Sequence, residues 1–122
     1  MITVATAGTR RISGGSVRMP PGGASRTHHH PDSDIIVAVV SGRAATIVWH
    51  DGEPEVLPHT VDEMCYVPAG LPHCAVNLSL SEPVLALEFR TDPEFNADVA
   101  LLPNLEDQAR ALVEELRASP VF

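Results

Sequence analysis

Histidines and aspartates are concentrated in one short stretch of this sequence. The run from His28 to Asp34 holds three histidines and two aspartates in seven positions. Imidazole and carboxylate groups are the usual protein ligands of divalent transition metals. Because side chains alternate between the two faces of a strand, His28 and His30 can converge on one ion while His29 points away. The stretch therefore predicts a metal site.

Two further residues are candidates for the same ion. A turn at residues 31–33 would bring Asp34 back beside the histidines, and of the two aspartates Asp32 is better suited to the turn. His73 ends the segment Pro68-Ala69-Gly70-Leu71-Pro72-His73, whose Pro-x-Gly turn could direct one more imidazole inward. The candidate ligands thus come from two distant parts of the chain.

These residues resemble the two sequence motifs of the cupin superfamily. The first motif has the form G-x5-H-x-H-x3,4-E-x6-G, and its matches here are Gly22, His28, His30, Asp34 in place of the glutamate, and Gly42 one position late. The second has the form G-x5-P-x-G-x2-H-x3-N, and its matches are Pro68, Gly70, His73 and Asn77, with Asp62 in place of the first glycine. Ile35 occupies the other spacing that the first motif permits for its glutamate.

The resemblance covers most of residues 16–91, and the match to both motifs is more specific than either alone. It implies an all-β fold, a small antiparallel double-stranded β-helix barrel that encloses one divalent transition metal ion. The metal ligands that it implies are His28, His30, Asp34 and His73, and the ion could be Fe, Mn, Ni, Co or Zn. The sequence is most similar to small, stand-alone bacterial cupins, a group that has no single activity.

Other polar residues are expected near the ion. Arg26 has the strand parity of the two histidines and is predicted to bind a substrate carboxylate, with a rim arginine as the alternative. Glu88 and Arg90 share one face of the last predicted strand, where they either line the cavity or pair at its mouth. Tyr66 and Met64 share a face and either line the pocket or pack outside it. Tyr66 and Glu88 are predicted as catalytic residues, and Arg90 as a second substrate-binding residue.

The other histidines and cysteines are expected to lie outside the site. Cys74 directly follows His73 and should therefore point to the opposite face, and Cys65 is expected to be a small core residue. His50 and His59 fall in turn-rich sequence and are expected to be exposed. Two cysteines outside a C-x-x-C pair indicate no disulfide framework, which favours a reducing, cytoplasmic setting.

Three functions are compatible with such a site. Dioxygenase-type chemistry on a small organic molecule that chelates the metal is the leading hypothesis. A non-redox isomerase, cyclase or lyase, with Zn(II) polarising a carbonyl group, is the second. The third is a ligand-binding or sensing cupin without turnover.

The rest of the sequence predicts the elements that position these residues. Short segments rich in Val, Ile and Thr lie between turn signals and predict strands at Ile2–Thr6, Ser16–Met19, Ile35–Val40, Ala44–Trp49, Glu55–Leu57, Met64–Val67, Cys74–Leu78 and Val84–Phe89. From Pro103 onward apolar residues recur at helical spacing, which predicts one C-terminal amphipathic helix with Asn104 as its cap.

Length and charge limit the possible partners. The chain of 122 residues is expected to form one domain, with the barrel at about 1–91 and a helical tail at about 92–122. Its net charge is −8 and all eight basic residues are arginine, so nucleic acid is an unfavourable partner. The start of the chain lacks the pattern of a signal peptide, and no apolar run is long enough to span a membrane. The resemblance to small cupins, which often pair through sheet edges, implies a homodimer, and the segment Ile2–Thr6 would otherwise leave a free sheet edge.

Overall fold

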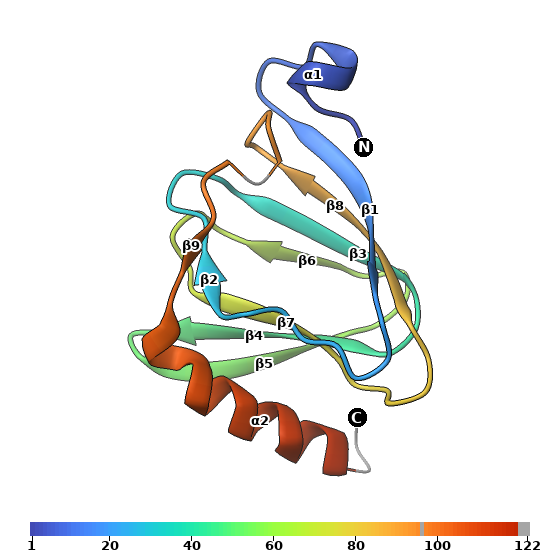
Figure 1. Cartoon of the computed structure of the whole chain (residues 1–122), viewed down its shortest axis with the longest axis vertical. Coiled ribbons are helices and arrows are strands. Elements are labelled where there is room, and N and C mark those ends of the chain that lie inside the picture. The colour runs from blue at the N-terminus through green and yellow to red at the C-terminus, as the bar shows by residue number, and fades with distance from the viewer. Residues whose placement is uncertain (96, 120–122) are drawn as a thin grey trace.

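Two antiparallel β-sheets curve around a common interior in the computed structural model, which describes residues 1–95 and 97–119 (Figure 1). One sheet has the strand order β1 (Ser13–Met19), β8 (Val84–Arg90), β3 (Ile35–Ser41) and β6 (Met64–Val67). The other has the order β5 (Glu53–His59), β4 (Ala44–His50), β7 (His73–Asn77), β2 (His28–His29) and β9 (Ala100–Leu101). The predicted all-β barrel with one C-terminal helix is confirmed.

The strand predictions hold best where alternation extends over several residues. Seven of the eight predicted segments correspond to observed strands, and β6 has the predicted bounds. The short strands β2 and β9 have two residues each, which is too short for a pattern of alternating side chains to be seen in the sequence.

The N-terminal strand prediction is wrong. Residues Val4–Ala7 form the short helix α1, and only Ile2 makes a β-bridge, to Gly14 on β1. Thr3 caps α1, because its hydroxyl accepts a hydrogen bond from the Thr6 N–H while the Thr6 hydroxyl accepts one from the Thr3 N–H. A reciprocal cap of this kind outweighs the strand preference of Val and Thr.

The C-terminal helix α2 (Glu106–Ala118) covers the outer face of the five-stranded sheet, as Figure 1 shows. A core of buried side chains joins the helix to β4 and β7; it comprises Ala45, Ile47, Trp49, Cys74, Val76, Leu78, Ala109, Val113 and Leu116. The predicted cap at Asn104 is wrong, because Asn104 lies in a 3-10 turn, η1 (Pro103–Leu105), that precedes the helix. The N-cap residue of α2 is Leu105. With the outer face of this sheet filled, its inner face is free to line the barrel.

The four-stranded sheet has a different outer face. Along β8, Val84, Ala86 and Arg90 are buried inside the barrel while Leu85 and Phe89 are exposed outside it. The longer helix α2 lies against the other sheet, as Figure 1 shows. No helix of the described chain has the length and apolar character needed to cross a membrane.

Candidate metal centre

Three histidines meet inside the barrel, on the neighbouring strands β2 and β7. His28 lies on β2 directly opposite His73, the first residue of β7, and His30 follows β2 by one residue. One ring nitrogen from each lies within 4.8 Å of the other two. The middle residue, His29, is outside this group, as strand alternation predicts. Two histidines that are close in the sequence, His28 and His30, and the distant His73 thus form a single cluster.

Hydrogen bonds determine which nitrogen each ring offers. Nδ1 of His28 lies 2.6 Å from the Arg26 carbonyl oxygen, and Nδ1 of His73 lies 3.0 Å from the Leu71 carbonyl oxygen. Nδ1 of His30 lies 3.0 Å from Oδ1 of Asp98. These oxygens can only accept, so each Nδ1 carries the proton and each Nε2 keeps its lone pair.

The resulting donor set fits a metal ion. Nε2 of His30 is buried and has no hydrogen-bond partner within residues 1–95 and 97–119. A buried nitrogen lone pair without a partner is costly, and coordination of a cation would satisfy it. Three neutral imidazoles that converge in this way are a typical site for Fe, Mn, Co, Ni or Zn.

Burial keeps two of the rings neutral. Removal from water and, to a smaller extent, the nearby His28 together lower the pKa of His73 to about 3. Burial also lowers the pKa of His28, an effect that the hydrogen bond to the Arg26 carbonyl and the negative charge of Glu88 oppose. Since a metal competes with protons for the same nitrogen, a low pKa favours coordination near neutral pH.

The structure does not bring the predicted fourth ligand, Asp34, into this cluster. Its Oδ1 accepts a hydrogen bond of 2.8 Å from the Ala69 N–H. The next residue, Ile35, is 3% exposed and lines the cavity instead. Neighbouring residues of a strand face opposite sides, so at the head of β3 only one of the two can face the ion. An apolar side chain occupies that position here.

The predicted pair Glu88 and Arg90 does line the cavity, and it also forms an ion pair. Nη2 of Arg90 lies 2.5 Å from Oε2 of Glu88, and Nη1 donates a hydrogen bond of 3.0 Å to the Phe95 carbonyl oxygen. The guanidinium also stacks over the Phe95 ring at 4.2 Å. Both sequence alternatives for the pair therefore apply, and Arg90 holds the Glu88 carboxylate in place.

The other two predicted site residues lie outside the cavity. Tyr66 is 58% exposed on the outer face of the four-stranded sheet, where it pairs with Ile36. Arg26 is exposed, and it lines a smaller hollow beside Glu106 rather than the barrel interior. The parity argument for Arg26 fails because β2 begins only at His28. Tyr66 as a catalytic residue and Arg26 as a substrate ligand are therefore unsupported by the geometry.

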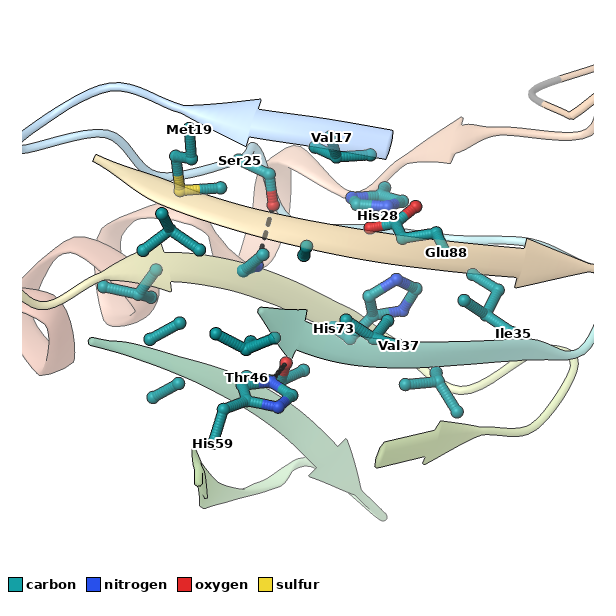
Figure 2. Close-up of a pocket in the computed structure, with 18 of the residues that line it drawn as sticks. Val17, Met19, Ser25, His28, Ile35, Val37, Thr46, His59, His73 and Glu88 are labelled. Carbon is teal, nitrogen blue, oxygen red and sulfur yellow. Dashed lines mark hydrogen bonds between the residues drawn. The ribbon is translucent and has the colours of Figure 1, made fainter. Parts of the chain in front are cut away.

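The cavity itself has a volume of about 530 Å³ and receives side chains from both sheets (Figure 2). One of its lining residues, His59, was expected to be exposed. It is half-buried at the end of β5, and its Nε2 lies 2.6 Å from the hydroxyl oxygen of Thr46. Burial lowers the pKa of His59. If the predicted strand at 55–57 had been extended by two residues, the alternation of side chains would have placed His59 inside the barrel.

Asp98 is the second residue that the sequence did not indicate. Besides His30, it accepts hydrogen bonds from the Ser33 hydroxyl at 2.7 Å and from the Asp32 N–H at 3.2 Å. Partial burial raises the pKa of Asp98, but these hydrogen bonds lower it by more, so the pKa lies below its ordinary value. A carboxylate behind a ligating histidine fixes the orientation of the ring and makes it a stronger ligand.

Comparison with protein families agrees with this geometry. Residues 15–89 match the cupin domain. This chain belongs to the cupin family. A search of curated proteins found no match to this cupin.

Solved structures share the fold. An oxalate decarboxylase from Bacillus subtilis superposes with a TM-score of 0.70 at 23% identity, over 88% of this cupin and 30% of that chain. An oxalate oxidase in complex with the substrate analogue glycolate gives 0.71 at 20% identity, over 96% of this cupin and 68% of that chain. The capsular polysaccharide assembling protein CapF from Staphylococcus aureus gives 0.66 at 20% identity, over 75% and 28%. This cupin thus spans less than a third of the decarboxylase and of CapF.

Proposed function

We propose that this cupin is a mononuclear metal-dependent enzyme that acts on a small organic molecule, with dioxygenase-type chemistry. The observation that carries the proposal is the convergence of three imidazole nitrogens within 4.8 Å of one another, two of which, from His28 and His73, belong to residues that line a cavity of about 530 Å³. An apolar cavity with a few polar groups gathered at one place is the usual form of a small-molecule site.

The ligand set bears on what could bind. Three neutral imidazoles leave the full charge of a divalent ion uncompensated and leave part of its coordination sphere open. Both features favour a substrate that binds through oxygen atoms and carries negative charge. When bound, a redox-active ion such as Fe(II) would supply electron transfer to dioxygen, and Zn(II) would supply Lewis-acid polarisation.

The protein's own residues would position the substrate and move protons. The Glu88 carboxylate lines the same cavity as His28 and His73, and could accept a proton from a substrate hydroxyl held there. Its ion pair with Arg90 keeps the carboxylate oriented. The apolar walls, which include Ile35 and Val37, exclude water from the reacting group.

The structural neighbours support an enzyme on this barrel. Two of them are named as an oxalate decarboxylase and an oxalate oxidase, and the oxidase binds glycolate. Oxalate and glycolate are small acids whose adjacent oxygens can chelate a metal ion. A chelating acid is therefore the first head group to test on this cupin.

A second candidate is a non-redox isomerase, cyclase or lyase. The observation that favours it is the presence of two proton-transferring groups in the cavity besides the candidate ligands His28 and His73, namely Glu88 and His59. Two such groups on different walls could remove a proton at one carbon or oxygen and return it at another.

One experiment separates these functions. The protein is purified without chelators, its metal content is measured, and the Fe(II) form is mixed anaerobically with chelating acids and diketones before air is admitted. Oxygen uptake that depends on both iron and substrate is the expected result, with His73→Ala as the control. Absence of uptake with every metal would overturn the dioxygenase proposal. Turnover by the Zn(II) form without oxygen would establish the second candidate, and a ligand recovered unchanged would indicate a binding protein.

The homodimer remains a prediction. Of its two grounds, the resemblance to small cupins is unaffected, but the free edge at Ile2–Thr6 is absent because Val4–Ala7 form α1.

A further inference from the structure

The strand registers divide the cavity into successive levels. Glu88, Ala86 and Val84 follow one another along the inner face of β8, and all three line the cavity. On β3, Val37 lies opposite Glu88 and Val39 lies opposite Ala86. At about 3.3 Å per residue, the four steps along the strand from Glu88 to Val84 span about 13 Å. The cavity is therefore a deep channel along the strands.

The two ends of this channel differ in polarity. Figure 2 shows His28, His73 and Glu88 gathered toward one end and Met19 at the other. Met19 lies opposite Val84 on the neighbouring strand β1. Beyond the level of Glu88, most lining residues are apolar; they include Val17, Met19, Val39, Ala44, Val84 and Ala86.

The few polar side chains beyond the histidine end already have partners. The Ser25 hydroxyl accepts a hydrogen bond of 2.8 Å from the Ala75 N–H. Thr46 and His59 bond to each other at 2.6 Å. A substrate with many hydroxyl groups would lose its hydrogen bonds to water here and gain few in return. The walls therefore disfavour a sugar or another polyhydroxylated molecule.

From these observations we infer the class of substrate: a molecule with a metal-chelating polar head and an elongated apolar body that extends from the histidines toward Met19. This inference rests on the proposed function, because the head binds the ion held by the three histidines. A two-carbon acid would leave most of a 530 Å³ channel filled with water against apolar walls. An apolar body would displace that water, and its burial would provide most of the binding free energy.

A series of alkyl hydroxamates tests the inference directly. Each has the same two-oxygen chelating head, and the chain is lengthened from acetohydroxamate to decanohydroxamate. The probes are titrated into the Co(II)-loaded protein, and binding is followed by the visible absorption of the cobalt. We expect the Kd to fall about two- to fourfold with each added methylene until the chain fills the depth of about 13 Å, and then to level off.

Two variants show whether the chain occupies the inferred channel. Ala86→Phe places a ring across the channel one level beyond Glu88. It should abolish the gain from longer chains while acetohydroxamate still binds. Leu87→Phe adds a similar volume to the neighbouring residue of β8, which faces outward and is 40% exposed, and should leave the whole series unchanged. The series on the unmodified protein decides the question even if a variant does not fold.

The outcomes distinguish this inference from the proposal beneath it. If acetohydroxamate binds the cobalt protein but longer chains bind no tighter, the apolar body is wrong and the metal-dependent function stands. An equal decrease in Kd with alkyl length in Ala86→Phe would also overturn the inference, since the alkyl chain would then lie elsewhere. If no hydroxamate changes the cobalt spectrum, the proposed metal site with open coordination positions is wrong, and so is the inferred substrate class.

Discussion

The two ends of the cavity are held together by different forces. At the histidine end, each of the three rings has its Nδ1 tied to a specific oxygen, and Glu88 is paired with Arg90. At the far end, the side chains of Met19, Val39 and Val84 form an apolar cluster. One end depends on direction and charge, whereas the other depends on shape and volume.

This difference separates what the ion requires from what the substrate requires. The three histidines of the histidine end belong to the cupin motifs, so they indicate the fold and the metal. The residues of the far end lie on β1, β3 and β8, outside the motif positions, and they set the length and polarity of what can enter. Substitutions at one end should therefore leave the property of the other end unchanged.

Removing a ligand should have the largest effect. In His73→Ala, one of three coordinating nitrogens is lost, and metal affinity should fall by more than the roughly 10–100-fold that loss of an outer partner costs. Titration with Co(II), followed by absorption, measures it. His50→Ala is the control, because His50 is exposed and pairs with Glu55, away from the three histidines. Equal affinities in the two variants would contradict the assignment of His73.

Loss of the carboxylate behind His30 should have the next largest effect. Asp98→Asn keeps the shape of the side chain but weakens its hold on the His30 ring, so metal affinity should fall roughly 10–100-fold. The same cobalt titration applies. Asp51→Asn, in an exposed turn where asparagine tolerates the positive φ of 51°, provides the matched control. An unchanged affinity in Asp98→Asn would mean that the backbone alone orients the ring.

A substitution at the far end should lower the stability of the fold and leave metal affinity unchanged. Val84→Ala removes buried apolar contacts with Val39 and Ala86, so the free energy of unfolding should fall by about 1 kcal/mol. Urea unfolding of the metal-free protein measures this loss. Metal affinity should stay at the wild-type level, and a large decrease would show that the two ends are coupled.

The pH dependence of stability should change through His59. Burial lowers its pKa from the ordinary value of 6.5, so the unfolded chain binds the proton more readily than the folded one. Stability from this group is therefore present above about pH 6.5 and is lost as the pH falls toward the folded-state pKa. In His59→Gln the metal-free protein should lose less stability between pH 7 and pH 5 than the wild type does. Parallel stability curves for the two proteins would contradict this role of burial.

The smallest effect is expected at Asp34. Because its carboxylate binds the Ala69 N–H rather than facing the histidines, Asp34→Asn should leave metal affinity within about twofold of the wild type. A loss comparable to that of His73→Ala would restore Asp34 as a ligand.

The sequence predicted the three histidines because their signals are local. Strand parity relates His28 to His30, and a turn with fixed spacing precedes His73. The choice between Asp34 and Ile35 depends on a shift of one residue at the head of β3, which composition does not reveal. The barrel fold could also be predicted, since apolar and polar residues alternate along its longer strands and its turns contain glycine and proline.

Other features depend on contacts that are distant in the sequence. Asp98 lies 68 residues from His30, and nothing near either residue indicates that they meet. Tyr66 shares the β6 strand with inward-facing Val67, so its outward orientation follows from the pairing with β3 rather than from its own neighbours. Such placements are determined by sheet register and tertiary packing.

The central claim is that His28, His30 and His73 hold one metal ion. Anomalous difference density from crystals grown with Co(II) tests it most directly. The account predicts one strong peak per chain, within bonding distance of Nε2 of all three rings and not of Asp34. Cobalt density elsewhere, with the three rings turned away from one another, would contradict it.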